Sequence, residues 1–300
     1  MASGSVRPGP GLAAYLEASK AVNKLYGDIQ KHVLAKAAHS DRRTDCLHPS
    51  AMIKPDWCHR AAAYTLTQGP RPAEAVKFTR ENIFQEGHNT HAKWQRWLQE
   101  MHRLAGDWEC RVCGSVFWED ETPARCPRCS AHGSCLVYAE VPLNAPALTI
   151  GGRSDGYCPD DGCLIEIKTL GLGSLRYELP GFIDKFAVHA EGRSGLDLTR
   201  MWRSVTRPLP AAWRQGQLYM YLANHFEDLP VDRMLYIYDF KPTQESKCFE
   251  VAYDESASEP LIEAAQVITD CVHAGTLPPC NINYAHGCKN CRAYEEVDAS

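Results

Sequence analysis

Apolar residues recur at three- and four-residue spacing in several long stretches of the chain. This period predicts helices at 11–37, 75–104, 213–224 and 261–274. Shorter runs that are apolar or alternate with polar residues predict strands at 137–141, 148–157, 163–168 and 234–240. The turn residues Asp160-Asp161-Gly162 make the second and third of these strands a predicted hairpin. Helices and strands that interleave in this way are typical of an α/β protein.

Two stretches depart from this pattern. Residues 106–135 are rich in cysteine and strand-like only in short pieces, which predicts a small inserted domain. Residues 171–210 show no clear hydrophobic period. A chain of 300 residues can hold one core of about 200 residues together with an insertion. We therefore expect an N-terminal helical region at 1–45 and one main domain at 46–300. The main domain is interrupted by the insertion and closed by a cysteine-rich tail at 278–292.

The overall charge limits the kind of nucleic-acid binding to expect. The formal net charge of -5 argues against a generally basic binder, but a local basic face is enough for phosphate contacts. The chain has no apolar run of membrane-spanning length, and residues 1–10 lack the apolar core of a signal peptide. We expect no membrane contact and a cytoplasmic location, in the protein's own cell or in a host cell if a phage encodes it.

A pair of carboxylates and a lysine form the strongest candidate for catalysis. Glu166 and Lys168 are two residues apart on a predicted strand, so both project from one face while Ile165 and Ile167 face the other. Charges among apolar neighbours are costly unless something uses them. Mg²⁺ or Mn²⁺ bound by Asp155 and Glu166 would use them. Lys168 could then deprotonate or orient the attacking water, or offset phosphate charge. An exposed hairpin with an incidental ion pair is the alternative.

Further candidates lie on the predicted helices. His91, four residues after Gly87, could give a metal its nitrogen ligand, with His88 as a competitor. Gln217 and Tyr221 are four residues apart and share a helix face, which could bind substrate. Gln215 and Tyr219 have the same spacing, and spacing alone does not choose between the two pairs.

The order of these motifs resembles a known nuclease family. Gly87 with His91, Glu140, Gly152-Arg-Ser-Asp155, Glu166-Ile-Lys168 and Gln217 with Tyr221 resemble the RecB-like branch of the PD-(D/E)XK superfamily. Its CRISPR-adaptation nucleases and phage exonucleases are the most similar, over about residues 46–292.

The resemblance implies a fold, a site and a reaction. The fold is a restriction-endonuclease-like core, a mixed sheet flanked by helices, here with an inserted zinc ribbon. The site comprises His91, Asp155 and Glu166 as metal ligands, Lys168 as a catalytic residue, and Gln217 with Tyr221 at the substrate. The reaction is metal-dependent hydrolysis of DNA phosphodiesters by an exonuclease that processes DNA ends, in phage recombination, replication or CRISPR adaptation.

Fourteen cysteines without an export signal indicate metal binding rather than disulfides. Two CxxC pairs close together suit one tetrahedral structural zinc, and unpaired reduced cysteines are the alternative. The four residues are Cys110, Cys113, Cys126 and Cys129.

The tail holds a second set of three cysteines, Cys280, Cys288 and Cys291. The resemblance implies that Cys58 is their fourth partner around an iron–sulfur cluster, and four cysteines suit the [4Fe–4S] type. The spacing within the tail departs from the family pattern, so zinc remains an alternative for this set.

A group of arginines is the candidate DNA-facing surface, with Trp202 and Trp213 interleaved. Arginine can contact phosphate and indole rings can stack on bases, whereas a solvated loop with core tryptophans is the alternative. Arg207 and Arg214 are the favoured substrate contacts in a group that comprises Arg193, Arg200, Arg203, Arg207 and Arg214.

The expected partners are single-stranded or end-containing DNA and recombination or CRISPR-adaptation proteins. Two rival functions remain. One is a non-catalytic DNA-binding or scaffold protein on the same fold, and the other is a subunit that trims ends only within a CRISPR-adaptation complex.

Overall fold

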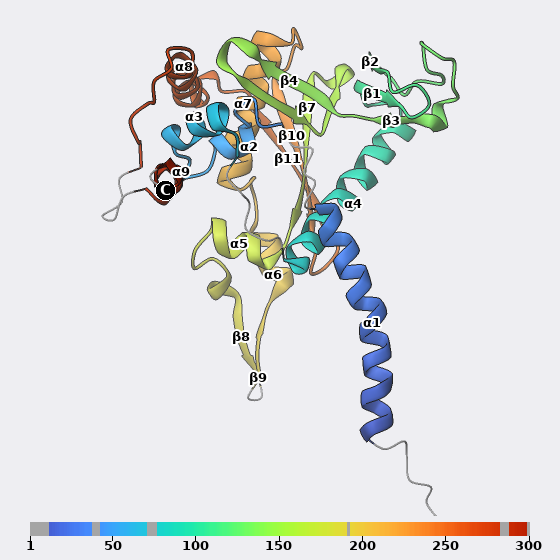
Figure 1. Cartoon of the computed structure of the whole chain (residues 1–300). Coiled ribbons are helices and arrows are strands. Elements are labelled where there is room, and N and C mark those ends of the chain that lie inside the picture. The colour runs from blue at the N-terminus through green and yellow to red at the C-terminus, as the bar shows by residue number, and fades with distance from the viewer. Residues whose placement is uncertain (1–11, 38–42, 71–76, 191–192, 283–287, 299–300) are drawn as a thin grey trace, which may run out of the picture. The chain divides into compact units, whose positions relative to one another are not determined.

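A mixed four-stranded sheet, in the order β11-β10-β7-β6, lies at the centre of the main unit (Figure 1). β6 (Gly156–Cys158) runs antiparallel to β7 (Cys163–Leu170), and β7 runs parallel to β10 (Arg233–Phe240). β11 (Glu245–Ala252) pairs antiparallel with β10 at the edge. The predicted strands at 163–168 and 234–240 are confirmed. The predicted hairpin is confirmed for β6 and β7, but the rest of the strand predicted at 148–157 is a separate strand, β5 (Ile150–Ser154), which pairs with β4 (Val141–Ala145). The sequence pattern did not identify β11, whose residues alternate between exposed and half-buried.

The computed structural model describes residues 12–37, 43–70, 77–190, 193–282 and 288–298. The chain divides into two compact units, one made of residues 1–42 and 72–85 and the other of residues 43–71 and 86–300. In the first unit, α1 (Leu12–Ala37) meets the start of α4 (Phe78–Glu100), where the rings of Tyr26 and Phe78 lie 5.8 Å apart. The helices predicted at 11–37 and 75–104 are thereby confirmed.

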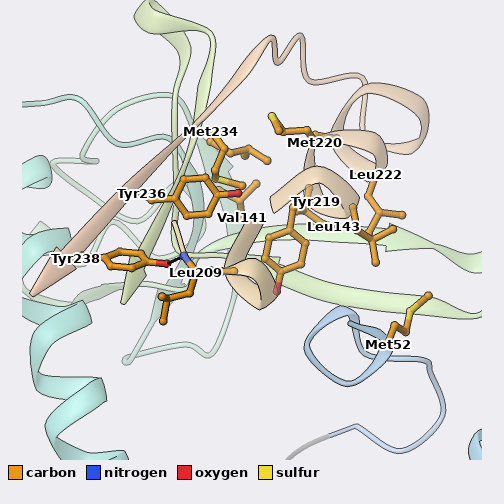
Figure 2. Packing of buried hydrophobic residues seen from close by; sticks show 14 of the residues in the cluster. Met52, Val141, Leu143, Leu209, Tyr219, Met220, Leu222, Met234, Tyr236 and Tyr238 are labelled. Atoms are coloured by element: carbon orange, nitrogen blue, oxygen red, sulfur yellow. Dashed lines mark hydrogen bonds between the residues drawn. The ribbon is translucent and has the colours of Figure 1, made fainter. Parts of the chain in front are cut away.

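The two faces of the sheet are covered by different elements. Leu164 and Leu170 of β7 belong to the large core, which includes residues of α7 (Pro210–Phe226), β4 (Val141–Ala145) and β5 (Ile150–Ser154). Figure 2 shows residues of α7 and β4 in this core beside residues of β10.

Ile165 and Ile167 point to the opposite face of the sheet. There they pack with Leu104 and with Trp94 and Leu98 of α4. The alternation predicted for β7 is therefore correct, and a mixed sheet with helices on both faces agrees with the coarse fold class that was expected.

A glycine allows α7 to lie close to β10. A Cβ atom on Gly216 would stand 1.9 Å from the hydroxyl oxygen of Tyr236 and 3.3 Å from Met234, and both of these side chains are buried. Leu209, the residue just before α7, donates its amide hydrogen to the hydroxyl of Tyr238 at 2.9 Å, as Figure 2 shows. These contacts fix where α7 crosses the sheet.

The stretch at 171–210 contains short elements that the period did not reveal. They are α5 (Leu172–Glu178), the hairpin of β8 (Ala187–Ala190) and β9 (Arg193–Leu196), and α6 (Leu198–Ser204). Trp202 of α6 is 2% exposed and stacks on Phe240, with ring centroids 4.8 Å apart. Trp202 is therefore a core residue, and its predicted role in stacking on bases is wrong.

A second, three-stranded sheet has the order β2-β1-β3. Its strands are β1 (Gly106–Cys110), β2 (Val116–Glu119) and β3 (Leu136–Tyr138), and we call residues 106–138 the cysteine module. A small core joins Trp108 and Leu136 to Cys110 and Cys126.

Four further helices complete the main unit, and none of the helices in the described part of the chain is long and apolar enough to cross a membrane. They are α2 (Pro49–Met52), α3 (His59–Gln68), α8 (Glu259–His273) and α9 (Lys289–Asp298). α8 fulfils the prediction of a helix at 261–274.

Candidate active site and metal clusters

Three side chains from different elements converge beside β7, and we call them the His–Glu–Asp cluster. His91 comes from α4, Glu140 precedes β4 and Asp155 follows β5, and their ligand atoms all lie within 4.8 Å of one another. His91 Nδ1 is 3.0 Å from Asp155 Oδ1. The competing His88 is exposed on α4. Of the two histidines, the structure brings His91 to the carboxylates.

Asp155 is held in place by two hydrogen bonds. Its Oδ2 accepts the amide hydrogen of Ile167 at 2.6 Å, and its carbonyl oxygen accepts from Gln95 Nε2 at 3.0 Å. The first bond joins Asp155 to the strand that carries Glu166 and Lys168. Gln95 lies one turn after His91 on α4, so this residue, which the sequence did not single out, helps to align the helix with Asp155.

Glu140 has an uncommon backbone conformation. Its φ of 67° places a non-glycine residue in the left-handed region, which is found mostly where the surroundings or a function impose it. Burial, followed by the nearby charge of Asp155, raises the pKa of the Glu140 carboxyl. Two carboxylates crowded in this way would be stabilised by a cation between them.

Glu166 and Lys168 form an ion pair on the α7 side of the sheet. Burial raises the pKa of Glu166 to about 7, although the ammonium group of Lys168 opposes that rise. Burial alone would lower the pKa of Lys168, but Glu166 and Asp155 outweigh it and raise that pKa. Lys168 is therefore held in its protonated form.

The residues of α7 at this site differ from those predicted. Lys168 Nζ donates to Gln215 Oε1 at 3.2 Å, and Gln215 Nε2 donates to the hydroxyl of Tyr219 at 2.9 Å. This is the glutamine–tyrosine pair that spacing alone could not distinguish from Gln217 and Tyr221.

Gln217 and Tyr221 have other partners. Gln217 donates to the carbonyl of Ala252 at 3.0 Å and accepts from the amide of Asp254 at 2.8 Å, so it joins α7 to the end of β11. Tyr221 stacks on His225 at 4.3 Å. The structure does not bring these two residues to Lys168. The sequence offered no signal for the choice, because α7 is buried continuously from 215 to 220 and has no polar face there.

The arginine group is spread over different environments. Arg200, Arg203 and Arg207 are exposed, whereas Arg214 is half-buried and donates to the carbonyl of Ile53 at 3.1 Å. The side chain of Arg193 lies outside the described part of the chain. A neighbouring residue that the sequence did not single out is Glu178 of α5, which accepts from the amide of Ala211 at 3.3 Å and adds to the raised pKa of Lys168.

The donor set at the His–Glu–Asp cluster fits a hard divalent cation. It offers two carboxylates and one imidazole, with Glu166 close enough to Asp155 and His91 for their charges to act on its own pKa. Mg²⁺ and Mn²⁺ prefer oxygen ligands of this kind and keep several waters.

The four cysteines of the cysteine module fit a single tetrahedral ion. Sγ of Cys110 lies 3.6 Å from Sγ of Cys129, and Sγ of Cys113 lies 3.8 Å from Sγ of Cys126. Zinc with bonds of about 2.3 Å to four thiolates needs sulfur–sulfur distances of about 3.8 Å. The hydroxyl of Ser115 beside Cys126 lowers the pKa of this thiol to about 6, which favours the thiolate that a metal requires.

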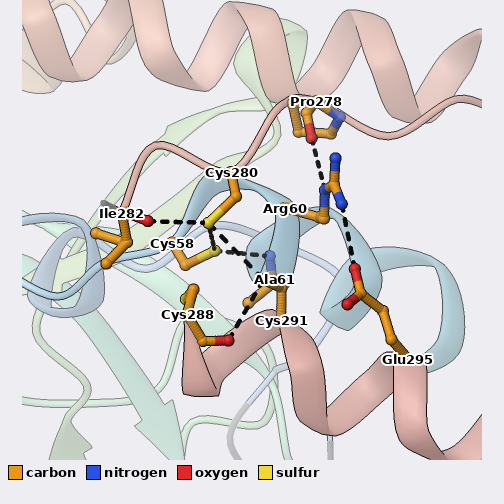
Figure 3. Close-up of polar contacts among 9 residues, drawn as sticks. All are labelled: Cys58, Arg60, Ala61, Pro278, Cys280, Ile282, Cys288, Cys291 and Glu295. Carbon is orange, nitrogen blue, oxygen red and sulfur yellow. Dashed lines mark hydrogen bonds and ion pairs between the residues drawn. The ribbon is translucent and has the colours of Figure 1, made fainter. Parts of the chain in front are cut away.

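The structure also brings Cys58 together with the three tail cysteines, and we call these four residues the tail cluster (Figure 3). Sγ of Cys280 lies 3.7 Å from Sγ of Cys58 and also 3.7 Å from Sγ of Cys291. These distances again fit one tetrahedral ion. The thiolates of a [4Fe–4S] cluster stand farther apart, because each binds a different iron. The four cysteines can hold a metal, and the iron–sulfur identity stays a prediction.

Hydrogen bonds around the tail cluster tie its two segments together. Arg60 Nε donates to the carbonyl of Pro278 at 3.1 Å, and its Nη1 lies 3.2 Å from Glu295 Oε1 (Figure 3). The amide of His59 donates to Asn281 Oδ1 at 2.9 Å. The start of α3 is thus joined to the tail even apart from a metal.

Comparison with known proteins identifies one segment. Residues 108–134 match the family described as "Rubrerythrin, rubredoxin-like domain", so the cysteine module is similar to a known iron- or zinc-binding type. No curated protein matches the chain.

Solved structures resemble the chain only distantly. An alkaline exonuclease (LHK-Exo) from Laribacter hongkongensis is 11% identical, with 90% of this chain and 98% of that one covered and a TM-score of 0.44. Its complex with dAMP is 10% identical over 78% and 90%, with a TM-score of 0.43. The protein SSO0001 is 12% identical over 86% and 98%, with a TM-score of 0.39. All three TM-scores lie below 0.5, so these structures do not define the fold of this chain or the role of its site.

Proposed function

We propose that the chain is a divalent-metal-dependent DNA nuclease of the PD-(D/E)XK superfamily. The observation that carries the proposal is the convergence of the His–Glu–Asp cluster with the ion pair of buried Glu166 and half-buried Lys168 on one strand. The nuclease domain would span 46–300 with a restriction-endonuclease-like core. The insertion at 106–135 and the tail at 278–292 would stabilise it.

The metal would be held by His91, Asp155 and Glu166, with Glu140 as a further carboxylate ligand. Bound Mg²⁺ or Mn²⁺ supplies Lewis acidity and lowers the pKa of a water molecule. Because Asp155 is fixed through Ile167 and Gln95, its Oδ1 is presented toward His91 rather than free to rotate. This fixed geometry supports a role in ion binding.

The raised pKa of Lys168 favours a role as a positively charged hydrogen-bond donor over a role as a base. A lysine that its neighbours keep protonated donates hydrogen bonds and is a poor base. We infer that Lys168 stabilises negative charge on the phosphate, while Gln215 and Tyr219 hold its ammonium group in position.

Two arginines near the site are the proposed contacts to the DNA substrate. Arg207 is exposed and Arg214 is anchored at Ile53, and both would contact phosphates of the DNA. From the motif order we propose exonuclease action on DNA ends, in the cytoplasm, in phage recombination, replication or CRISPR adaptation. The intact catalytic set argues against a non-catalytic scaffold.

Cleavage of end-labelled single- and double-stranded DNA with Mg²⁺ or Mn²⁺ tests the proposal. Lys168→Ala is expected to lower the rate by about 10²–10⁴-fold, the usual effect of removing a group that acts in proton transfer or charge stabilisation. Lys185→Ala, at an exposed lysine outside the site, is the matched control and should cleave like the wild type. Absence of cleavage by folded, metal-replete wild type would sink the nuclease proposal and favour a binding or scaffold protein.

A further inference from the structure

The small sheet of the cysteine module continues to Glu140. β1 and β3 pair from Cys110 opposite Leu136 to Trp108 opposite Tyr138. Beyond β3, Ala139 donates its amide to the carbonyl of Asp107 at 2.7 Å, and Asp107 donates to the carbonyl of Glu140 at 2.9 Å. One backbone ladder therefore has cysteine ligands at one end and a member of the His–Glu–Asp cluster at the other.

The ladder is closely fitted near Glu140. A Cβ atom at Gly106, where φ is 151°, would lie 2.6 Å from the hydroxyl oxygen of Tyr138 and 3.0 Å from the carbonyl oxygen of Glu140. The Tyr138 hydroxyl donates to the carbonyl of Ala105 at 2.8 Å, and its ring meets Trp108 edge-on with centroids 5.3 Å apart. A shift of the module strands would therefore displace the backbone of Glu140.

We expect the module to depend on its metal for order. Its buried core has only four residues, and two of them, Cys110 and Cys126, are members of the four-cysteine set. A core this small does not stabilise a fold without a metal or a disulfide. The left-handed conformation of Glu140 also has to be imposed by its surroundings.

We propose that the cysteine module acts as a metal-dependent clamp that positions Glu140 for divalent-cation binding. An ion held by Cys110, Cys113, Cys126 and Cys129 orders β1 and β3, and the ladder fixes the Glu140 carboxylate beside Asp155 and His91. Metal binding to the four cysteines of the module raises the affinity of the His–Glu–Asp cluster for divalent cations. By the same coupling, a cation at that cluster raises the affinity of the four cysteines for their metal. The inference rests on the divalent-cation site of the proposed function.

The test measures Mn²⁺ binding to the full chain by calorimetry or electron paramagnetic resonance. Wild type with the module metal present is compared with wild type after chelation of that metal and after its restoration with Zn²⁺. Chelation is expected to raise the Kd for Mn²⁺ by about 10–100-fold, as loss of groups that orient a metal ligand does. Zn²⁺ should restore the original Kd.

Four variants separate the clamp from other effects. Cys129→Ser should weaken Mn²⁺ binding like chelation, whereas Cys135→Ser, at a cysteine outside both clusters, should not. In a Glu140→Gln background, Cys129→Ser should cause no further loss, because the coupling acts through Glu140. Gly106→Ala should weaken Mn²⁺ binding while the module keeps its metal.

The outcomes distinguish two failures. An unchanged Kd for Mn²⁺ after chelation and in Gly106→Ala would overturn the clamp and leave the cation site intact. Absence of Mn²⁺ binding by metal-replete wild type, together with no effect of His91→Ala, would overturn the cation site itself.

Discussion

Lys168 of β7 donates a hydrogen bond of 3.2 Å to Gln215 of α7, and these two residues link the sheet to the helix that crosses it. Gln215 Nε2 in turn donates a hydrogen bond to the hydroxyl of Tyr219 at 2.9 Å. The lysine is therefore positioned from two sides, by the Glu166 carboxylate on its own strand and by an amide oxygen from α7. Such a lysine has little freedom to leave the site.

Gln215→Ala is expected to lower kcat by about 10–100-fold, because removal of a residue that orients a catalytic group has effects of this size. The free energy of unfolding should also fall, by about 1–3 kcal/mol, because the Lys168 ammonium group and the buried Tyr219 hydroxyl lose a hydrogen-bond partner. Steady-state cleavage kinetics and urea denaturation on the same preparations measure both quantities.

Gln217→Ala is the matched control for Gln215→Ala and should lose stability to a similar extent without losing activity. It removes the hydrogen bonds of Gln217 to the Ala252 carbonyl and the Asp254 amide, and at about 0.5–1.5 kcal/mol for each bond their loss costs about 1–3 kcal/mol of stability. The activity per folded molecule should remain. A loss of activity per folded molecule in Gln217→Ala and not in Gln215→Ala would contradict the assignment of Gln215.

The sequence predicted some parts of this site and not others, for physical reasons. Alternation on β7 is a local property, so the opposite faces of Ile165 and Glu166 could be read from the period of two. The choice between Gln215 and Gln217 depends on how a helix buried on all sides is rotated, which no local period encodes. The place of Glu140 depends on a backbone turn with φ of 67° and on pairing with Asp107, both set by the fold.

The stability of the metal-free protein is expected to fall as the pH rises from about 4.5 to about 7. Burial raises the pKa of Glu166 from 4.5 to about 7, so the folded state holds a proton that the unfolded state releases. The stabilisation that Glu166 contributes is fully present below pH 4.5 and is lost as the pH rises past about 7, its pKa in the folded state. The pKa values of Glu140 and His91 are also raised in the folded state, so these two groups likewise make the protein less stable as the pH rises.

Urea denaturation across this pH range, with and without Mg²⁺, measures the effect. Glu166→Gln should flatten the pH dependence, because glutamine does not titrate. Mg²⁺ should restore stability mainly above pH 7, where the carboxylates are ionised. A metal-free wild type whose stability rises steadily from pH 4.5 to 7 would contradict this account.

The two cysteine clusters are expected to hold one tetrahedral ion each. Sulfur–sulfur distances of 3.6 to 3.8 Å predict two zinc or iron ions per chain in addition to the divalent-cation site. Metal analysis and visible absorption spectra of protein purified without oxygen measure this. Four irons at the tail cluster, with the absorbance of an iron–sulfur centre, would instead establish the [4Fe–4S] cluster.

Cys58→Ser should remove one ion, lower Tm and leave the metal of the cysteine module in place. Cys248→Ser, at an exposed cysteine outside both clusters, is the matched control. Equal metal content in the two variants would show that Cys58 is not a ligand.

Gly216→Ala is expected to destabilise the fold by about 1–3 kcal/mol, because the new methyl group would overlap the buried Tyr236 hydroxyl. Gly173→Ala is the control, since a Cβ atom there meets nothing within 4 Å. A surface change of that kind should stay within about 0.5 kcal/mol. Equal unfolding free energies for the two variants would mean that α7 does not approach β10 as closely as described.

The parallel pairing of β7 with β10 also bears on how the protein is made. Cys163 faces Arg233 and Leu170 faces Phe240, and the chain between the two strands contains α5, α6 and α7. Contacts so distant in sequence form slowly, because a long loop has to close before they can stabilise it. During synthesis, the strand bearing Glu166 and Lys168 emerges from the ribosome well before its neighbour in the sheet. The nascent chain therefore exposes an incomplete sheet edge until β10 arrives, and aggregation at that stage is the hazard that assisted folding would relieve.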